Sequence, residues 1–415
     1  MRVKRCLHPV GHGAFFSEHF ENLRKSCFNV VYDCGIKYFP KKRLQDSVDD
    51  AIGNSGRKHV DFLFISHLDE DHVNGIEYMI KKKYVDAQTT FVLPLYKDYL
   101  LRIYEHFEGQ FVLSIYDVIG STHSKSVYYV PLTEGENEDR KDEEGNGQQP
   151  RINMEDGISE TIGNSVVVNG LTGRVIPPRS VFTYKEIWEY IPFNLHDSNS
   201  ADFFKAIDNS KILNIADMVD VEAIFKNKCS RITKNSTAEQ KEATRKYREL
   251  KRIYDSVGIR VNGDRRININ SLAVVSQAVN EVEVRIAFTD YESMIAEGYM
   301  RQYCYGYLTK GYGACTYTGD LNLSQDADFD LFEKKVKVVL RGEAKHHLLQ
   351  IPHHGSKTSY NKRFCGGMSG KCFVNFNSEN GIFDERIRFD FFCARKALIP
   401  VTEIESSKYI WEFWV

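Results

Sequence analysis

The sequence lacks the long apolar run, roughly eighteen residues, that a membrane-spanning helix needs, so we expect no membrane association. It also lacks an excess of one charge, because 55 Lys and Arg against 57 Asp and Glu give a formal net charge of −2. That balance excludes a globally basic protein that coats DNA, although a local basic groove stays open. No apolar segment follows the basic residues at the start, so we expect no secretory signal.

The sequence has no CxxC pair, and its nine cysteines are scattered between Cys6 and Cys393. This usage argues against a disulfide framework and a Cys-ligated zinc ribbon, and it predicts reduced thiols in a cytoplasmic protein. A GxSxG motif is absent as well, which leaves the hydrolases that carry a serine nucleophile in that motif without support.

Hydrophobic residues make up 42% of the chain and charged residues 27%, which predicts a substantial buried core. We treat residues 1–415 as a single domain. Short apolar runs bounded by turn residues predict strands. These runs lie at residues 29–32, 61–65, 91–95, 271–275, 282–288, 313–317 and 336–340.

Two segments depart from the strand pattern. Residues 134–150 hold seven carboxylates and no apolar residue, which predicts an acidic flexible loop. The pattern of residues from about 200 to 260 predicts a helical insertion, because Tyr247, Leu250 and Tyr254 fall on one face of a helix. This insertion is a candidate surface for a protein partner.

A local basic cluster lies inside this helical segment. It comprises Lys226, Lys228, Arg231 and Lys234. A solvated helix face is the default interpretation, and a surface that faces nucleic acid is the alternative.

One segment holds most of the candidate chemistry, Ser66-His67-Leu68-Asp69-Glu70-Asp71-His72-Val73-Asn74-Gly75. Four potential metal ligands fall within six residues, directly after an apolar run that predicts a strand. Imidazole and carboxylate groups are good ligands for divalent first-row metals. Packing does not readily explain such a density of ligands at a strand end, so the pattern indicates a metal site.

Two further motifs lie downstream. Thr318-Gly319-Asp320 places a carboxylate at the end of an expected strand. Residues 351–359, with the sequence IPHHGSKTS, combine adjacent histidines with hydroxyl groups and a lysine. The second motif therefore combines metal-ligand chemistry with groups that bind phosphate.

The order HxDxDHxxG, TGD and PHHGS resembles the metallo-β-lactamase fold. More narrowly, it resembles the metallo-β-lactamase domain of the ComEC DNA-uptake protein, because Asp69 stands where most of the superfamily has a second histidine. The segments Val10–Ala14 and Val31–Gly35 are similar to the VGQGDA and LIDTG segments of that branch, with His12 in place of the usual glutamine. Asn270-Ser271-Leu272 resembles its NxSLVL segment.

The resemblance implies an αββα sandwich of class α/β, with two divalent metal ions at one edge of the sheets. The implied ligands are His67, Asp69, Asp71, His72, Asp320 and His354. His67 and Asp69 would bind the first ion, Asp320 would bridge the two ions, and the others would bind the second ion. His353 would lie behind the ligands or donate a proton, and it could exchange roles with His354.

The third ligand of the first ion stays open. His196 is the outside candidate among the histidines between His72 and Asp320, which otherwise comprise His106 and His123. We expect the two ions to be Mn²⁺ or Zn²⁺, with Mg²⁺ as an alternative. A carboxylate in place of an imidazole favours Mn²⁺ or Mg²⁺ over Zn²⁺, relative to a typical member of the superfamily.

Two metal ions close together suit a phosphodiester, so we expect a DNA nuclease that uses a metal-activated hydroxide. Asp71 would orient that hydroxide, and His353 and Lys357 complete the expected catalytic residues. The expected substrate-binding residues are Asn270, Ser356, Lys357, Thr358 and Ser359. Related stand-alone proteins also make a role in anti-phage defence an expectation. The alternatives are hydrolysis of a small substrate (a nucleotide second messenger, a lactone or a thioester) and a non-catalytic metal-binding module.

Overall fold

The computed structural model of the chain describes all residues except 24, 97, 109–113, 125, 134–148, 157–162, 196–202, 204, 258–270, 289–308, 343–346, 367–370 and 379–382. The acidic loop expected at 134–150 lies almost wholly outside the described residues, so its character stays a prediction. Every cysteine in the described part is a free thiol. No helix in that part is long and apolar enough to cross a membrane.

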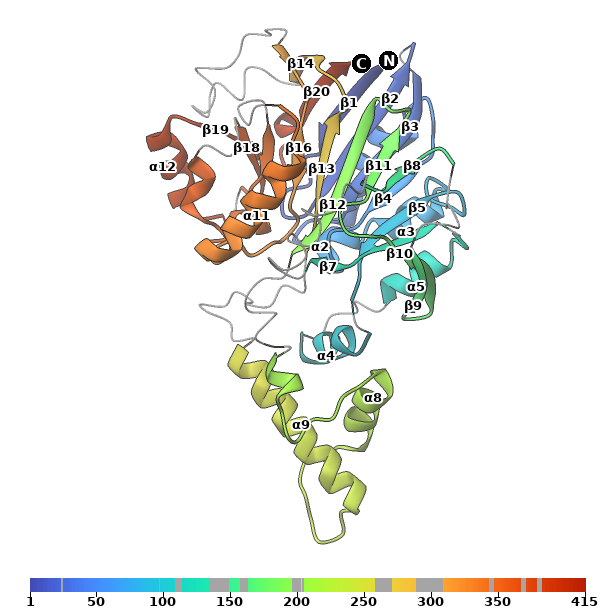
Figure 1. Ribbon diagram of the computed structural model, residues 1–415, viewed down its shortest axis with the longest axis vertical. Coiled ribbons are helices and arrows are strands. Elements are labelled where there is room, and N and C mark those ends of the chain that lie inside the picture. Colours follow the sequence, from blue (N-terminus) through green and yellow to red (C-terminus); the bar gives the residue numbers. More distant parts are fainter. Residues whose placement is uncertain are drawn as a thin grey trace.

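The first sheet combines strands from both ends of the chain (Figure 1). In spatial order it contains β15 (Thr309–Gly311), β14 (Val282–Phe288), β20 (Tyr409–Trp414), β1 (Arg2–Leu7), β2 (Phe15–Asn22), β3 (Lys25–Cys34), β4 (Phe62–Phe64), β5 (Thr90–Pro94), β6 (Val127–Val130), β10 (Leu171–Val175) and β9 (Asn164–Val168). The strands from β3 to β6 run parallel to one another. Their carboxyl ends therefore open at the same edge of the sheet.

The second sheet is built from the later part of the chain. In spatial order it contains β19 (Ala397–Val401), β18 (Lys371–Asn375), β17 (Leu348–Gln350), β16 (Cys315–Tyr317), β13 (Leu272–Ala278), β12 (Trp188–Leu195), β11 (Val181–Tyr184) and β8 (Arg151–Asn153), and β7 (Leu132–Thr133) pairs with β12. The strands from β16 to β19 are parallel, as in the first sheet.

The two sheets pack face to face, because alternate residues of each strand point to opposite sides. In β3, Val30 and Tyr32 enter the core between the sheets, whereas Val31 faces outward. In β13, Val274 enters the same core and Val275 faces outward. Both faces of each sheet are apolar, so each needs a covering layer of helices.

Helices supply those outer layers. The outer side of the first sheet packs on α1 (Lys41–Val48), α3 (Ile76–Lys81), α4 (Asp98–Glu108) and α5 (Ser114–Gly120). The outer side of the second sheet packs on α11 (Asp326–Val339) and α12 (Glu385–Ala394). A single helical turn, α2 (Glu70–Val73), follows β4. The expected αββα sandwich is confirmed.

The strand predicted at 336–340 is wrong, because Val336 belongs to α11. Phe329, Phe332 and Val336 repeat with helical spacing and are buried against the second sheet. The apolar run at its end is thus the last turn of an amphipathic helix.

A helical projection extends from one end of the sandwich (Figure 1). It contains α8 (Met218–Asn227) and α9 (Ala238–Val257), both within the expected 200–260 segment. Leu250 and Tyr254 of the predicted stripe are buried in a small core that is separate from the core between the sheets. Ile103 of α4 belongs to the same small core.

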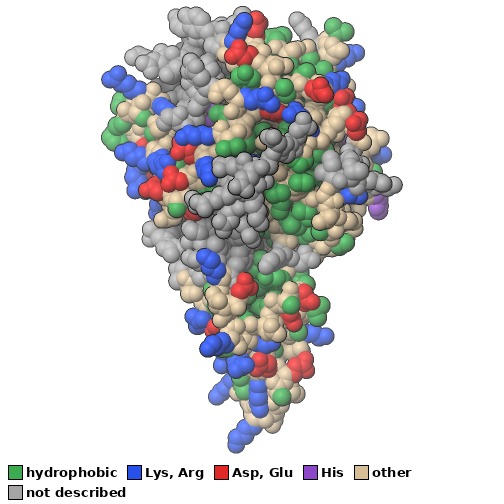
Figure 2. Space-filling view, viewed as in Figure 1, with side chains coloured by type: hydrophobic (Ala, Val, Ile, Leu, Met, Phe, Trp, Pro, Cys, Tyr) green, Lys and Arg blue, Asp and Glu red, His purple; other side chains and the backbone are tan. Residues whose placement is uncertain are grey.

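One member of the basic cluster differs from the others. Lys228 places its Nζ 2.8 Å from Nε2 of His106 and 3.9 Å from the ring centre of Tyr247. Its side chain is therefore part of the packing between α4, α8 and α9, and it does not lie on a free basic surface. Lys226, Arg231 and Lys234 are exposed. Figure 2 shows Lys and Arg side chains distributed over the projection.

Candidate metal centre

The motif residues converge where strands of both sheets end. Asp33 is the last residue but one of strand β3, and His67 to His72 follow β4. Asp320 follows β16, and His354 follows β17. Because parallel strands carry their connections at the same edge, segments far apart in the sequence meet here. Figure 1 places α2 at the end of the sheets from which the helical projection extends.

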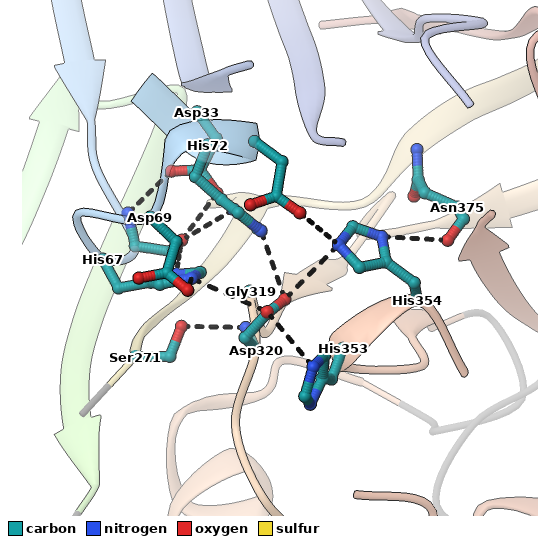
Figure 3. A network of polar contacts seen from close by, with 12 residues as sticks. Asp33, His67, Asp69, His72, Ser271, Gly319, Asp320, His353, His354 and Asn375 are labelled. Carbon is teal, nitrogen blue, oxygen red and sulfur yellow. Dashed lines mark hydrogen bonds and ion pairs between the residues drawn. The ribbon is translucent and has the colours of Figure 1, made fainter. Parts of the chain in front are cut away.

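The first group of ligands, the His67 cluster, comprises His67, His72 and Asp320. Nε2 of His72 lies 3.2 Å from Oδ1 of Asp320, and Nε2 of His67 lies 3.6 Å from Oδ2 of the same carboxylate. Asp69 is at the margin, with its Oδ2 3.9 Å from Nε2 of His67. Figure 3 shows the three members of the cluster turned toward one another. One potential ligand atom from each lies within 4.8 Å of the other two.

The second group, the His12 cluster, comprises His12, Asp71 and His354. Oδ2 of Asp71 lies 3.1 Å from Nε2 of His12 and 3.3 Å from Nε2 of His354. All three side chains are buried. Oδ1 of Asp320 lies 3.9 Å from Nε2 of His354, so this carboxylate stands between the two clusters.

Hydrogen bonds behind the ligands orient the imidazole rings. Nδ1 of His72 lies 2.8 Å from Oδ2 of Asp33, and Nδ1 of His354 lies 3.1 Å from the backbone oxygen of Asn375. Ser66 donates from both its backbone N–H and its hydroxyl group to Asp33. Since Asp33 and the Asn375 carbonyl accept at Nδ1, the Nε2 atoms of both rings are left to face the carboxylates. Such partners commonly fix metal-binding histidines.

The electrostatics favour ionised carboxylates. Burial raises the pKa of Asp71, but the adjacent imidazoles of His12 and His354 outweigh it and hold this pKa well below its usual 3.8. Burial likewise opposes ionisation of Asp320, yet the neighbouring His72, His353 and His67 lower its pKa well below 3.8.

The histidines separate into two kinds. Burial lowers the pKa of His67 and of His12 to about 4, so both rings are neutral and can act as ligands. Burial also opposes a charge on His72, but Asp320 and Asp33 raise its pKa well above 6.5. A positive charge is therefore favourable at the Nε2 atom of His72, next to Asp320. Either a proton or a metal ion can supply that charge.

These residues fit divalent metal ions. Within the described residues, the buried Nε2 atoms of His67, His72 and His354 have no hydrogen-bond partner. Buried polar atoms are normally paired, and these three face anionic oxygens. Two imidazoles and one carboxylate in each cluster form a donor set that suits Zn²⁺ as well as Mn²⁺. The His67 cluster is thus richer in nitrogen than the expected first site of His67 and Asp69.

The PHHGS loop has a strained backbone. His353 and His354 have φ angles of 50° and 53°, a region that non-glycine residues seldom adopt. Such strain persists where the surroundings enforce it and often occurs at functional sites. His353 is more exposed than His354, and its Nε2 lies 3.8 Å from Oδ2 of Asp320.

The hydroxyl residues of this loop mostly serve the loop itself. Oγ of Ser359 lies 2.8 Å from Nδ1 of His353, and Oγ of Ser356 lies 2.8 Å from Oγ1 of Thr358. Ser356 and Ser359 are buried, Thr358 is half-buried, and Lys357 is exposed. Of the expected phosphate-binding side chains, Lys357 is therefore the one most open to a substrate.

The structure brings together every ligand expected from the motifs, but it groups His72 with His67 and Asp320. The assignment of ligands to individual ions stays a prediction. Asn270 and His196 lie outside the described residues, so their expected roles are likewise still predictions. His106 packs in the projection, and His123 is exposed.

Sequence reasoning assigned no role to three contributors to this site. Asp33 and His12 stood in segments that resembled the family, and His12 departed from the usual glutamine. The histidine at this position was the only feature of the sequence that could have pointed to a role for His12. The carbonyl of Asn375 had none, since any residue carries a backbone oxygen.

Comparisons with known proteins add little. Neither the protein-family models nor the curated proteins gave a match. Among solved structures, 15 chains match. One is human tRNase Z, short form, which is 11% identical, has a TM-score of 0.32, and covers 96% of this chain and 92% of its own. A likeness this weak carries no conclusion about fold or activity.

Proposed function

We propose that the protein is a metal-dependent phosphodiester hydrolase that acts on nucleic acid, with DNA as the expected polymer. The observation that carries this proposal is the position of Asp320, which contacts His67 and His72 on one side and approaches His354 on the other. A carboxylate shared by two ligand clusters would hold two metal ions close together, as a two-metal hydrolase needs. Two such ions activate water and neutralise the charge that develops on a phosphoryl group.

Different residues would hold the metal ions and orient their ligands. Asp71 and Asp320 stay ionised and provide the negative charge that holds cations at the strand ends. Asp33 and the Asn375 carbonyl hold the rings of His72 and His354 in the orientation that a ligand needs.

His353 is suited to a different task. Its side chain is half-buried, and its Nδ1 is bonded to Ser359, which leaves Nε2 on the side of Asp320. A ring held in this way can deliver a proton to the leaving oxygen of a phosphodiester. The exposed Lys357 supplies a cation for a neighbouring phosphate.

DNA is proposed because the motif order resembles the ComEC domain and because the helical projection carries exposed basic residues near the same end of the sandwich. Small phosphodiesters are the alternative, since the chain as a whole has no positive charge in excess. A role in anti-phage defence stays a prediction.

The test is an assay of chelator-treated protein reloaded with Mn²⁺, Mg²⁺ or Zn²⁺. The substrates are circular DNA, linear DNA, single-stranded RNA and bis(4-nitrophenyl) phosphate, with Asp71→Ala as the inactive control. We expect the wild type to cleave DNA in a metal-dependent manner, and we expect Asp71→Ala to leave DNA uncut. Cleavage of RNA alone or of the small ester alone would reassign the substrate. Bound metal without hydrolysis of any of these substrates would favour the non-catalytic module.

A further inference from the structure

His12 is held against the candidate metal centre by its own loop. It lies between β1 and β2 and is 2% exposed. The backbone N–H of Ala14 donates to the carbonyl oxygen of Asp71 at 3.0 Å, which ties the loop to the ligand segment. Gly13 has a φ of +153°, and a Cβ there would come within 2.3 Å of the carbonyl oxygen of Gly35. Because only glycine permits this approach, the sequence builds the close contact that buries His12.

The imidazoles of His12 and His354 converge on one oxygen atom. Their Nε2 atoms lie 3.1 Å and 3.3 Å from Oδ2 of Asp71, and the ring centres are 4.1 Å apart. Atoms that bind one Zn²⁺ at about 2.1 Å lie roughly 3 to 3.5 Å from one another. The two distances from the carboxylate to the imidazoles fall in this range, and the three potential ligand atoms of the His12 cluster lie within 4.8 Å of one another.

The orientation of His354 supports the same conclusion. Nδ1 of His354 donates to the carbonyl oxygen of Asn375, which can only accept. This hydrogen bond turns Nε2, the other nitrogen of the ring, toward Oδ2 of Asp71 at 3.3 Å. Within the described residues, this buried Nε2 has no hydrogen-bond partner. A cation between the ring and the carboxylate would satisfy both groups, and it would also account for the approach of His12.

We propose that His12 is a ligand of a divalent metal ion that it shares with Asp71 and His354. The inference rests on the metal dependence of the proposed function and adds a ligand from outside the three motifs. With it, this ion has two imidazoles and one carboxylate from the chain, a set that suits Zn²⁺ and leaves a position for water or substrate. The competing interpretation is that His12 only donates a hydrogen bond to Asp71.

Two substitutions whose side chains have the same shape as each other separate these interpretations. His12→Gln keeps a group that can donate to Asp71 but replaces the imidazole with a weak ligand. His12→Glu keeps a strong ligand but cannot donate, and without metal it repels Asp71. The exposed His123→Gln is the matched control for loss of an imidazole. Each metal-free protein is titrated with Zn²⁺ against a chromophoric chelator, and the bound metal is counted by elemental analysis after desalting. Circular dichroism and thermal unfolding of the metal-free proteins establish that each variant is folded.

If His12 is a ligand, the wild type and His123→Gln hold two ions per chain, His12→Gln holds one, and His12→Glu holds two. His12→Glu should also gain more thermal stability from Zn²⁺ than His12→Gln does. Two ions in His12→Gln with fewer in His12→Glu would show that His12 is a hydrogen-bond donor and overturn the inference. Equal metal content in the wild type and His12→Gln, at whatever stoichiometry, would overturn it as well. Because binding is counted without turnover, these results are independent of whether the loaded protein hydrolyses phosphodiesters.

Discussion

Asp33 and His72 are both fully buried, and Oδ2 of Asp33 lies 2.8 Å from Nδ1 of His72. On the other side of the ring, Nε2 of His72 lies 3.2 Å from Oδ1 of Asp320. The imidazole thus stands between a carboxylate that orients it and a carboxylate that belongs to the candidate metal centre. This arrangement of carboxylate, histidine and metal site strengthens the imidazole as a ligand.

Asp33→Asn should therefore weaken metal binding by about 10- to 100-fold. The substitution preserves the shape of the side chain but removes the charge behind His72. Asn tolerates the φ of 54° at this position, so the fold should survive. Zn²⁺ affinity, measured by competition with a chelator, tests the prediction. An affinity equal to that of the wild type would leave Asp33 with a purely structural role.

Asp71→Ala and His72→Ala should each lose bound metal and reduce hydrolysis to background, without unfolding the protein. Each substitution removes a buried group that faces at least one other candidate ligand. Elemental analysis, the phosphodiesterase assay and circular dichroism are measured on the same preparation. Full activity at unchanged metal content in either variant is the outcome that the two-metal proposal does not allow.

The two histidines of the PHHGS loop should behave differently. His354→Ala should lose metal as well as turnover, and excess Mn²⁺ should restore part of the activity. His353→Ala should keep its metal and lose rate on the order of 10²-fold, as expected for a proton donor. That loss should shrink on a nitrophenyl phosphodiester, because a good leaving group needs little protonation. Equal metal content and equal losses on both substrates would refute the assignment, and the reverse pattern would exchange the two roles.

The stability of the metal-free protein should fall as the pH drops below about 6.5, in part because of His8. Burial, followed by the nearby Lys408, His19 and Lys4, lowers the pKa of His8 well below its usual 6.5. Below pH 6.5 the unfolded chain takes up a proton that folded His8 refuses, so the free energy of unfolding decreases by up to about 1.4 kcal/mol per pH unit.

His8→Gln removes this titration while keeping a group that can bond to the hydroxyl of Ser17. Urea unfolding at about pH 7.5 and about pH 5.5 should therefore show a loss of stability smaller by roughly 1 kcal/mol in the variant. The same loss in both proteins would mean that other groups account for the pH dependence.

The helical projection offers a separate test of nucleic-acid binding. A shallow groove of about 800 Å³ runs along α9 and is lined by both basic and acidic residues, including Lys241, Arg245, Arg248, Arg252, Glu242 and Glu249. Arg245 and Arg252 form ion pairs with Glu242 and Glu249. The exposed Lys226, Arg231 and Lys234 lie on the same projection. If the helical projection contacts DNA phosphates, changing Lys226, Arg231 and Lys234 to Gln should weaken DNA binding. Each lost contact should also reduce the slope of log K against log salt by about 0.9.

The matched control carries the same loss of charge elsewhere, at the exposed Lys58, Lys81 and Lys83. Binding is measured by fluorescence anisotropy across a series of salt concentrations. An unchanged slope in the projection variant, or an equal change in the control, would return the basic residues to a solvated helix face.

Several features were accessible from the sequence because they are local. A buried strand followed at once by His67, Asp69, Asp71 and His72 places its own ligands at a strand end, whatever the rest of the chain does. The stripe on α9 follows from the helical repeat alone. The strand predicted at 336–340 failed because its apolar run was considered without Phe329 and Phe332, which belong to the same helical face.

The sequence by itself determined which ligand types are present and that they follow strands. Only the tertiary structure decided which of them share a cluster. His72 points to Asp320 and Asp71 points to His354 because two sheets, built from distant parts of the chain, present their strand ends to one another. Periodicity predicts which side chains are buried but carries no information about which loops meet at a sheet edge. That pairing is set by long-range strand order and by packing of the apolar faces between the sheets.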